Sequence, residues 1–181
     1  MIKDGFSAYD SGFGFANAFR LLYSKSILSN LIATKDYIEN YNNISMIMPT
    51  IVNGALACEL FLKALIQQEC KSHSLLDLME QLEKEQPGKK AHIQDSCIKI
   101  MHEKKQRNTY DKQNFLQDME LLNKAFVKLR YWHEPRKDNE AQKNEIYSLD
   151  FVEIMVAILQ TECQIVFGPR PQSLPCAKEG G

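Results

Sequence analysis

The sequence has few of the residues that break helices and no clear signal for strands. Eight glycines and six prolines occur among 181 residues. No apolar–polar alternation persists, and no Asn-Gly or Asp-Gly pair joins two alternating segments, which argues against β-hairpins. No repeat recurs at the spacing of a solenoid protein. These absences leave an all-α fold as the prediction.

The sequence also lacks a large excess of charge of either sign and has no long apolar run. With 22 lysines and arginines against 23 acids, the net charge is −1, so any attraction for nucleic acid has to come from a local patch. The first residues lack a basic region followed by an apolar run, so we expect no secretory signal. The longest uncharged run, 40–58, contains asparagine, serine, threonine and proline and is too polar to predict a membrane span. We expect a cytoplasmic protein without membrane contact.

The cysteines do not form a metal-binding or disulfide pattern. They are five in number, at positions 58, 70, 97, 163 and 176. There is no CxxC and no Cys/His spacing suited to zinc, and His92 and His102 lack a third ligand. We therefore expect no metal and no cofactor, and interpret three of the cysteines as small apolar core residues of a protein in a reducing compartment: Cys58, Cys97 and Cys163.

Apolar residues recur at three- to four-residue steps along most of the chain, which predicts a series of helices. The expected ranges are 15–41, 46–70, 74–86, 89–107, 112–134 and 149–167. The glycines at 12 and 14 would precede the first helix, the polar cluster 40–43 would end it, and Pro49 would lie in the first turn of the second.

Local cap signals mark the later boundaries. Ser74 followed by Asp77 resembles a capping box, Asp111 suits an N-cap, and Gly168 followed by Pro169 ends the last helix. We predict a single domain over 1–168, built as an antiparallel up-down bundle of about five helices. The proline-rich, polar segment 169–181 is expected to be a disordered tail.

The segment 126–135, FVKLRYWHEP, concentrates unusual residues, including the single tryptophan. Arg130, His133 and Glu134 lie three and four residues apart, so a helix places them on one face. A histidine could act as general acid or base there, and an arginine could bind a phosphate. The alternative is a helix end where cations such as Lys128 complement the macrodipole. Residue types alone favour this second interpretation.

Glu59 and Lys63 are the charges on an otherwise apolar helical stretch. Their i, i+4 spacing, with the glutamate first, suits an ion pair on a solvent-facing strip. Alternatively, both point into a polar pocket shared with Arg130 and Glu134, where Glu59 and Arg130 would pair. His73 is interpreted as a residue at the start of a helix. The basic segment 89–107 could follow a nucleic-acid backbone, although a solvated face is the more common arrangement.

Taken in order, three pieces resemble the HEPN superfamily (higher eukaryotes and prokaryotes nucleotide-binding). They are the Glu59-x-x-x-Lys63 helix, the His73-x-Leu75 helix start and the Arg130-Tyr131 pair, and the resemblance covers roughly 48–82 and 115–167. It implies an antiparallel bundle of four or five helices and a frequent homodimer. Many members are metal-independent ribonucleases of toxin–antitoxin and phage-defence systems.

The ribonuclease signature of that superfamily is an arginine, four to six intervening residues and a histidine. Here His133 follows Arg130 at three residues and position 135 is proline. Lys128 has the right spacing from His133, but lysine lacks the bidentate fork of arginine. The Arg-Tyr form is similar to that of members without the full signature, which are binding or assembly modules.

Two functional predictions result. The first is a non-catalytic module that binds RNA, a nucleotide or a protein partner, such as a cognate antitoxin, through a basic-aromatic surface around Arg130. The surface would comprise Glu59, Lys63, Lys128, Arg130, Tyr131, Trp132 and Glu134. The alternative is a metal-independent ribonuclease, with His133 as acid or base and Arg130 or Lys128 stabilising the phosphate. Either protein would be a homodimer.

Overall fold

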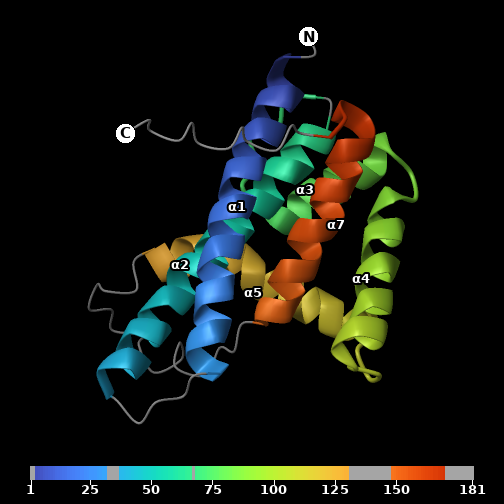
Figure 1. Ribbon diagram of the computed structural model, residues 1–181. Coiled ribbons are helices and arrows are strands. Elements are labelled where there is room, and N and C mark those ends of the chain that lie inside the picture. The colour runs from blue at the N-terminus through green and yellow to red at the C-terminus, as the bar shows by residue number, and fades with distance from the viewer. Residues whose placement is uncertain (1–2, 32–36, 67, 131–147, 170–181) are drawn as a thin grey trace, which may run out of the picture.

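The computed structural model describes residues 3–31, 37–66, 68–130 and 148–169, and within these ranges its regular structure is entirely helical. All-α was the predicted class, and it is confirmed. The helices are α1 (Lys3–Leu31), α2 (Tyr37–Leu65), α3 (Leu75–Glu85), α4 (Lys89–Lys105), α5 (Lys112–Arg130) and α7 (Leu149–Phe167). In Figure 1, α1, α4 and α7 run roughly lengthwise, whereas α5 runs across the view.

The first two helices pack along each other for much of their length, and their boundaries differ from the prediction. α1 begins at Lys3 rather than near residue 15, because Gly12 does not precede the helix but lies within it. A Cβ on Gly12 would stand 2.8 Å from Cδ1 of Phe61, so the glycine allows α1 to approach α2 closely.

The start and end of α2 were also predicted wrongly. Residues 40–43 lie inside α2 instead of ending α1, since asparagine disfavours a helix by only about 0.7 kcal/mol or less per residue. Pro49 is consequently in the helix interior. The hydroxyl of Thr50 donates to the carbonyl of Met46, and the Asn53 amide donates to the Pro49 carbonyl, both at 2.7 Å. α2 ends at Leu65, whose carbonyl accepts a hydrogen bond from the Gln86 amide at 3.0 Å.

The predicted caps are present where the structure describes them. The Ser74 side chain accepts the Asp77 N–H at the start of α3. Asp111 Oδ1 accepts two backbone N–H groups, both at 2.9 Å, at the start of α5. α7 has the predicted bounds and ends at Gly168, whose φ of 83° is suited to glycine. Residues 131–134 of the predicted fifth helix lie outside the described part of the chain.

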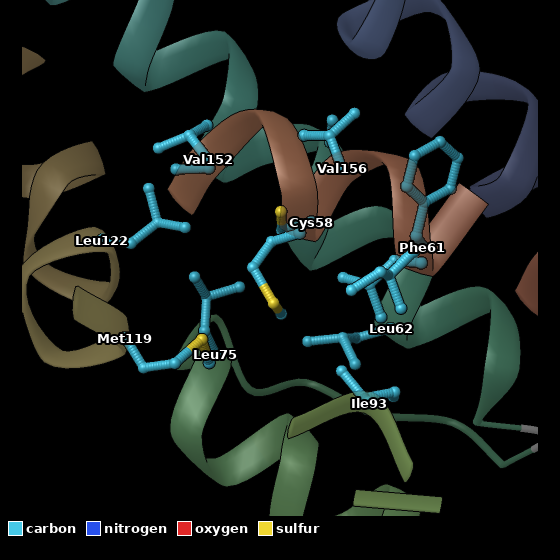
Figure 2. Packing of buried hydrophobic residues seen from close by; sticks show 14 of the residues in the cluster. Cys58, Phe61, Leu62, Leu75, Ile93, Met119, Leu122, Val152 and Val156 are labelled. Carbon is cyan, nitrogen blue, oxygen red and sulfur yellow. The ribbon is translucent and has the colours of Figure 1, made fainter. Parts of the chain in front are cut away.

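The hydrophobic core centres on α2. Figure 2 shows residues from five helices pointing toward one another: Cys58, Phe61 and Leu62 of α2, Leu75 of α3, Ile93 of α4, Met119 and Leu122 of α5, and Val152 and Val156 of α7. The contact between α2 and α7 is so close that a Cβ on Gly54 would lie 2.2 Å from Cγ1 of Val152. This close approach fixes the position of α2, which carries the candidate site.

The predicted core cysteines are buried, as expected for small apolar side chains. Cys58, Cys97 and Cys163 are each at most 1% exposed. Burial raises the pKa of Cys97 and of Cys163 to about 12, and it raises the pKa of Cys58 further. These thiols are therefore protonated at neutral pH and chemically inert.

One stretch in the described residues, Met46–Leu65, is long and apolar enough to cross a membrane when judged by length and composition alone. Half of it is buried inside the protein, and it also carries the ion pair of Glu59 with Lys63. Both features are those of a central core helix.

Candidate functional site

The candidate site is built around Glu59, a carboxylate in the apolar helix α2. This residue is 6% exposed, so its negative charge needs partners that stay in place. Its Oε1 atom lies 2.8 Å from Lys63 Nζ and 2.8 Å from Nδ1 of His73. Lys63 lies four residues after Glu59 on the same helix, α2, whereas His73 belongs to the segment just before α3. We refer to Glu59, Lys63 and His73 as the Glu59 cluster.

The predicted pairing of Glu59 with Lys63 is confirmed, but the pair does not lie on a solvent-facing strip. The carboxylate is buried, and Lys63 and His73 cover it: the Lys63 side chain is 18% exposed and the His73 side chain is 75% exposed. The role of His73 was missed by sequence reasoning, which treated it only as a residue at a helix start. Its Nδ1 faces the Glu59 carboxylate, and most of the ring is exposed to solvent.

A hydrogen bond joins the segment that carries His73 to α5. The backbone N–H of Leu75 donates to Oδ1 of Asn123 at 2.6 Å. α2 packs against both α3 and α5, and the bond of Leu75 holds the start of α3, two residues after His73, against α5. Arg130 follows Asn123 by seven residues on α5, which is roughly 10 Å along the helix axis.

The structure brings together only some of the predicted site residues. Glu59 and Lys63 are in contact, and Lys128 and Arg130 belong to α5, although the side chains of the latter two are outside the described set. The remaining predicted residues also lie outside it: Tyr131, Trp132, His133 and Glu134. The predicted pairing of Glu59 with Arg130 therefore stays a prediction.

A second buried carboxylate has the same kinds of partner. Glu162 of α7 is 5% exposed. Its Oε2 lies 2.5 Å from Nζ of Lys89, and its Oε1 lies 3.0 Å from Nε2 of His92. Sequence reasoning also missed this group, here called the Glu162 cluster. The signal that could have found it is the one noticed for Glu59, an acidic residue surrounded by apolar residues on a buried helix.

The Glu162 cluster also bears on the basic segment 89–107. Lys89 and Lys105 bond to carboxylates of α7, and Lys90 bonds to Glu80 of α3. These cations hold α4 against its neighbours instead of forming a free basic face. The arrangement does not favour the interpretation of this segment as a track for a nucleic-acid backbone.

Within the described ranges, no group of three or more histidine, cysteine, aspartate or glutamate side chains is placed to hold a metal ion. No family model, curated protein or solved structure matches the chain. The fold and site define an all-α protein in which two buried glutamates are each held by one lysine and one histidine.

Proposed function

We propose that the protein is a non-catalytic binding module, and that it binds RNA or a nucleotide at the surface formed by the Glu59 cluster and residues 124–130 of α5. The observation that carries this proposal is the burial of Glu59 beneath Lys63 and His73. The negative charge is covered by two nitrogen-bearing side chains. The Lys63 ammonium can donate hydrogen bonds to phosphate oxygens, and the His73 ring can do so at its second nitrogen when it is protonated.

The sequence of α5 adds positive charge beside this cluster. Residues 124–130, KAFVKLR, contain Lys124, Lys128 and Arg130 and no acidic residue. Lys124 is exposed, and the bond between Leu75 and Asn123 fixes this part of α5 against the start of α3. A phosphate-bearing ligand would be attracted by the local charge even though the whole protein has a net charge of −1.

The resemblance to the HEPN superfamily supports the same proposal. It implies an antiparallel bundle of four or five helices and a frequent homodimer, and a partner protein such as an antitoxin could cover the site. The short spacing between Arg130 and His133 supports binding without catalysis. We expect light scattering to give the mass of a dimer, and a monomer at high concentration would contradict this part of the proposal.

The test is a titration of fluorescently labelled single-stranded RNA, with adenosine nucleotides as competitors. Loss of one phosphate contact in Arg130→Ala should weaken binding at low salt and reduce the slope of log K against log [salt] by about 0.7. The matched control is Lys99→Ala, because Lys99 is an exposed cation of α4, a helix that contributes no residue to the proposed surface. Equal affinities for Arg130→Ala and Lys99→Ala would contradict the assignment of the surface.

A ribonuclease is the second candidate, and the geometry of His73 favours it. A histidine held by a buried carboxylate, with its ring exposed to solvent, is an arrangement suited to moving protons. In metal-free cleavage, the ribose 2′-hydroxyl loses its proton to a base and attacks the adjacent phosphate. The 5′-oxygen of the next nucleotide then leaves with a proton from an acid.

His133 is the acid or base in this alternative, with Arg130 or Lys128 stabilising the phosphate. The wild-type protein would cut single-stranded RNA in the presence of a chelator, and His133→Ala would abolish cleavage. A parallel His73→Ala variant tests whether the Glu59 cluster takes part. Equal cleavage by wild type and by both variants would exclude catalysis by these histidines.

A further inference from the structure

The Glu162 cluster lines a pocket that is separate from the Glu59 cluster. The pocket has a volume of about 460 Å³, and its lining comprises Gln86, Pro87, Gly88, Lys89, His92, Glu162 and Ile165. This volume lies within the range of about 300–1,000 Å³ that small-molecule sites occupy. It lies where the turn between α3 and α4 meets the C-terminal part of α7.

The start of α4 is held by hydrogen bonds that orient the Lys89 and His92 side chains. Gly88 has a φ of 87°, a conformation that favours glycine. The backbone N–H groups of Gly88 and Lys90 donate to the Glu83 carboxylate at 2.8 and 2.9 Å, and these bonds lower the pKa of Glu83. Lys89 and His92 follow at positions three residues apart, so they share one face of α4.

Each of these two side chains has polar atoms or N–H groups that do not contact Glu162. The Lys89 ammonium has three N–H groups and gives one to Oε2 of Glu162. The His92 ring contacts Oε1 through Nε2 and is 60% exposed, which leaves Nδ1 accessible; this atom donates to an anion when the ring is protonated. Glu162 lines the pocket but is only 5% exposed, and each of its oxygens already has a partner, so the more accessible polar groups are the lysine and the histidine.

Apolar surface adjoins these polar groups. Ile165 lies one turn beyond Glu162 on α7, is 74% exposed and belongs to the pocket lining. Exposed Pro87 belongs to the same lining. The pocket therefore offers an apolar wall next to the Lys89 ammonium and the His92 ring, both held by Glu162.

We infer that this pocket binds a small amphipathic oxyanion, in which a phosphate or carboxylate group contacts Lys89 and His92 and an apolar body packs on Ile165 and Pro87. Glu162 acts as a positioning residue: it holds the Lys89 and His92 side chains in place before the ligand arrives, which reduces the entropy lost on binding. A cationic ligand fits less well, because it would have to displace Lys89 or His92 to reach the buried carboxylate.

The experiment uses NMR titration of the isotope-labelled full chain with phenyl phosphate and, separately, benzoate. Inorganic phosphate and phenol are titrated as controls, because they represent the head group and the apolar body of phenyl phosphate. We expect phenyl phosphate or benzoate to shift the His92 ring and Gly88 amide signals with millimolar or tighter affinity. Inorganic phosphate should bind at least fivefold more weakly than phenyl phosphate, and phenol should not bind. Whichever of phenyl phosphate and benzoate binds more tightly identifies phosphate or carboxylate as the preferred head group.

Paired variants test the two parts of the pocket independently. Lys89→Gln should weaken binding at least fivefold, whereas Lys90→Gln should not, because Lys90 bonds to Glu80 and does not line the pocket. Ile165→Asn should weaken phenyl phosphate but leave inorganic phosphate unchanged. Val166→Asn is its control, since Val166 is also exposed but is not part of the lining.

Three results would overturn the inference. They are the absence of shifts at His92 with all anions, equal losses for Lys89→Gln and Lys90→Gln, and equal binding of phenyl phosphate by Ile165→Asn and wild type. Ile165 is on the surface, so its substitution keeps the inference testable if loss of Lys89 destabilises the fold around Glu162. An unchanged circular dichroism spectrum and melting temperature would establish that each variant is folded.

Discussion

Lys63→Met removes the ammonium group from the Glu59 cluster while keeping an apolar stem of similar size. The Glu59 carboxylate would remain buried with only His73 as its partner. Loss of one partner from a fully buried ion pair costs about 3–5 kcal/mol, and loss of an exposed pair costs about 0–1 kcal/mol. Lys63 is 18% exposed, and His73 remains in place, so the expected loss lies between these limits, at about 1–3 kcal/mol.

Urea denaturation followed by circular dichroism measures this loss. The melting temperature should fall in parallel, by about 2–4 °C for each kcal/mol in a chain of this size. The matched control is Lys71→Met: Lys71 and Glu69 are 90% and 85% exposed and their charged atoms are 4.0 Å apart. This control should change stability by no more than about 0.5 kcal/mol.

A double variant, Glu59→Leu with Lys63→Met, tests whether the loss of stability comes from losing the ion pair or from leaving the Glu59 charge buried without Lys63. Replacing both partners by apolar groups removes the buried charge, so much of the lost stability should return. If Lys63→Met is no more destabilising than Lys71→Met, the carboxylate does not depend on Lys63, and the account of the Glu59 cluster is wrong.

Two further predictions concern packing and pH. Gly54→Ala should be less stable than Gly14→Ala by about 1–3 kcal/mol, because a Cβ at Gly54 meets Val152 at 2.2 Å whereas Gly14 faces open space; equal stabilities in urea would contradict the close contact of α2 with α7. Burial raises the pKa of the Asp118 carboxyl despite the hydrogen bond from Tyr110. The protonated carboxyl therefore contributes fully to the free energy of unfolding below the pKa of Asp118 in the unfolded chain, and this contribution is lost as the pH rises through its pKa in the folded protein. The stability of Asp118→Asn relative to wild type should therefore increase from about pH 3 to pH 7, and a constant difference in urea titrations across that range would refute this assignment.

Features that depend on local sequence were predictable. The range of α7, the N-cap at Ser74 and the N-cap at Asp111 follow from residues within one or two turns of each boundary. The start of α1 was not predictable in this way. Whether Gly12 interrupts a helix or allows close packing depends on Phe61, which is distant in sequence.

The same distinction between local and long-range contacts applies to the candidate site. The contact of Glu59 with Lys63 is local to one helix and was predicted from spacing. The contact with His73 spans fourteen residues, and the Glu162 contact with Lys89 spans seventy-three. Such partners depend on how the helices pack, so the sequence indicates only that a lone acid on an apolar helix needs one.

The most direct test of the proposed function is a titration of labelled single-stranded RNA with the wild-type protein at about 50 and 200 mM salt, chelator present, with the RNA analysed for cleavage afterwards. The proposal predicts measurable binding at the lower salt, weaker binding at the higher salt, and intact RNA at the end. Absence of binding at low salt would contradict an RNA-binding surface at the Glu59 cluster and α5. Cleaved RNA would contradict the non-catalytic role and favour the ribonuclease.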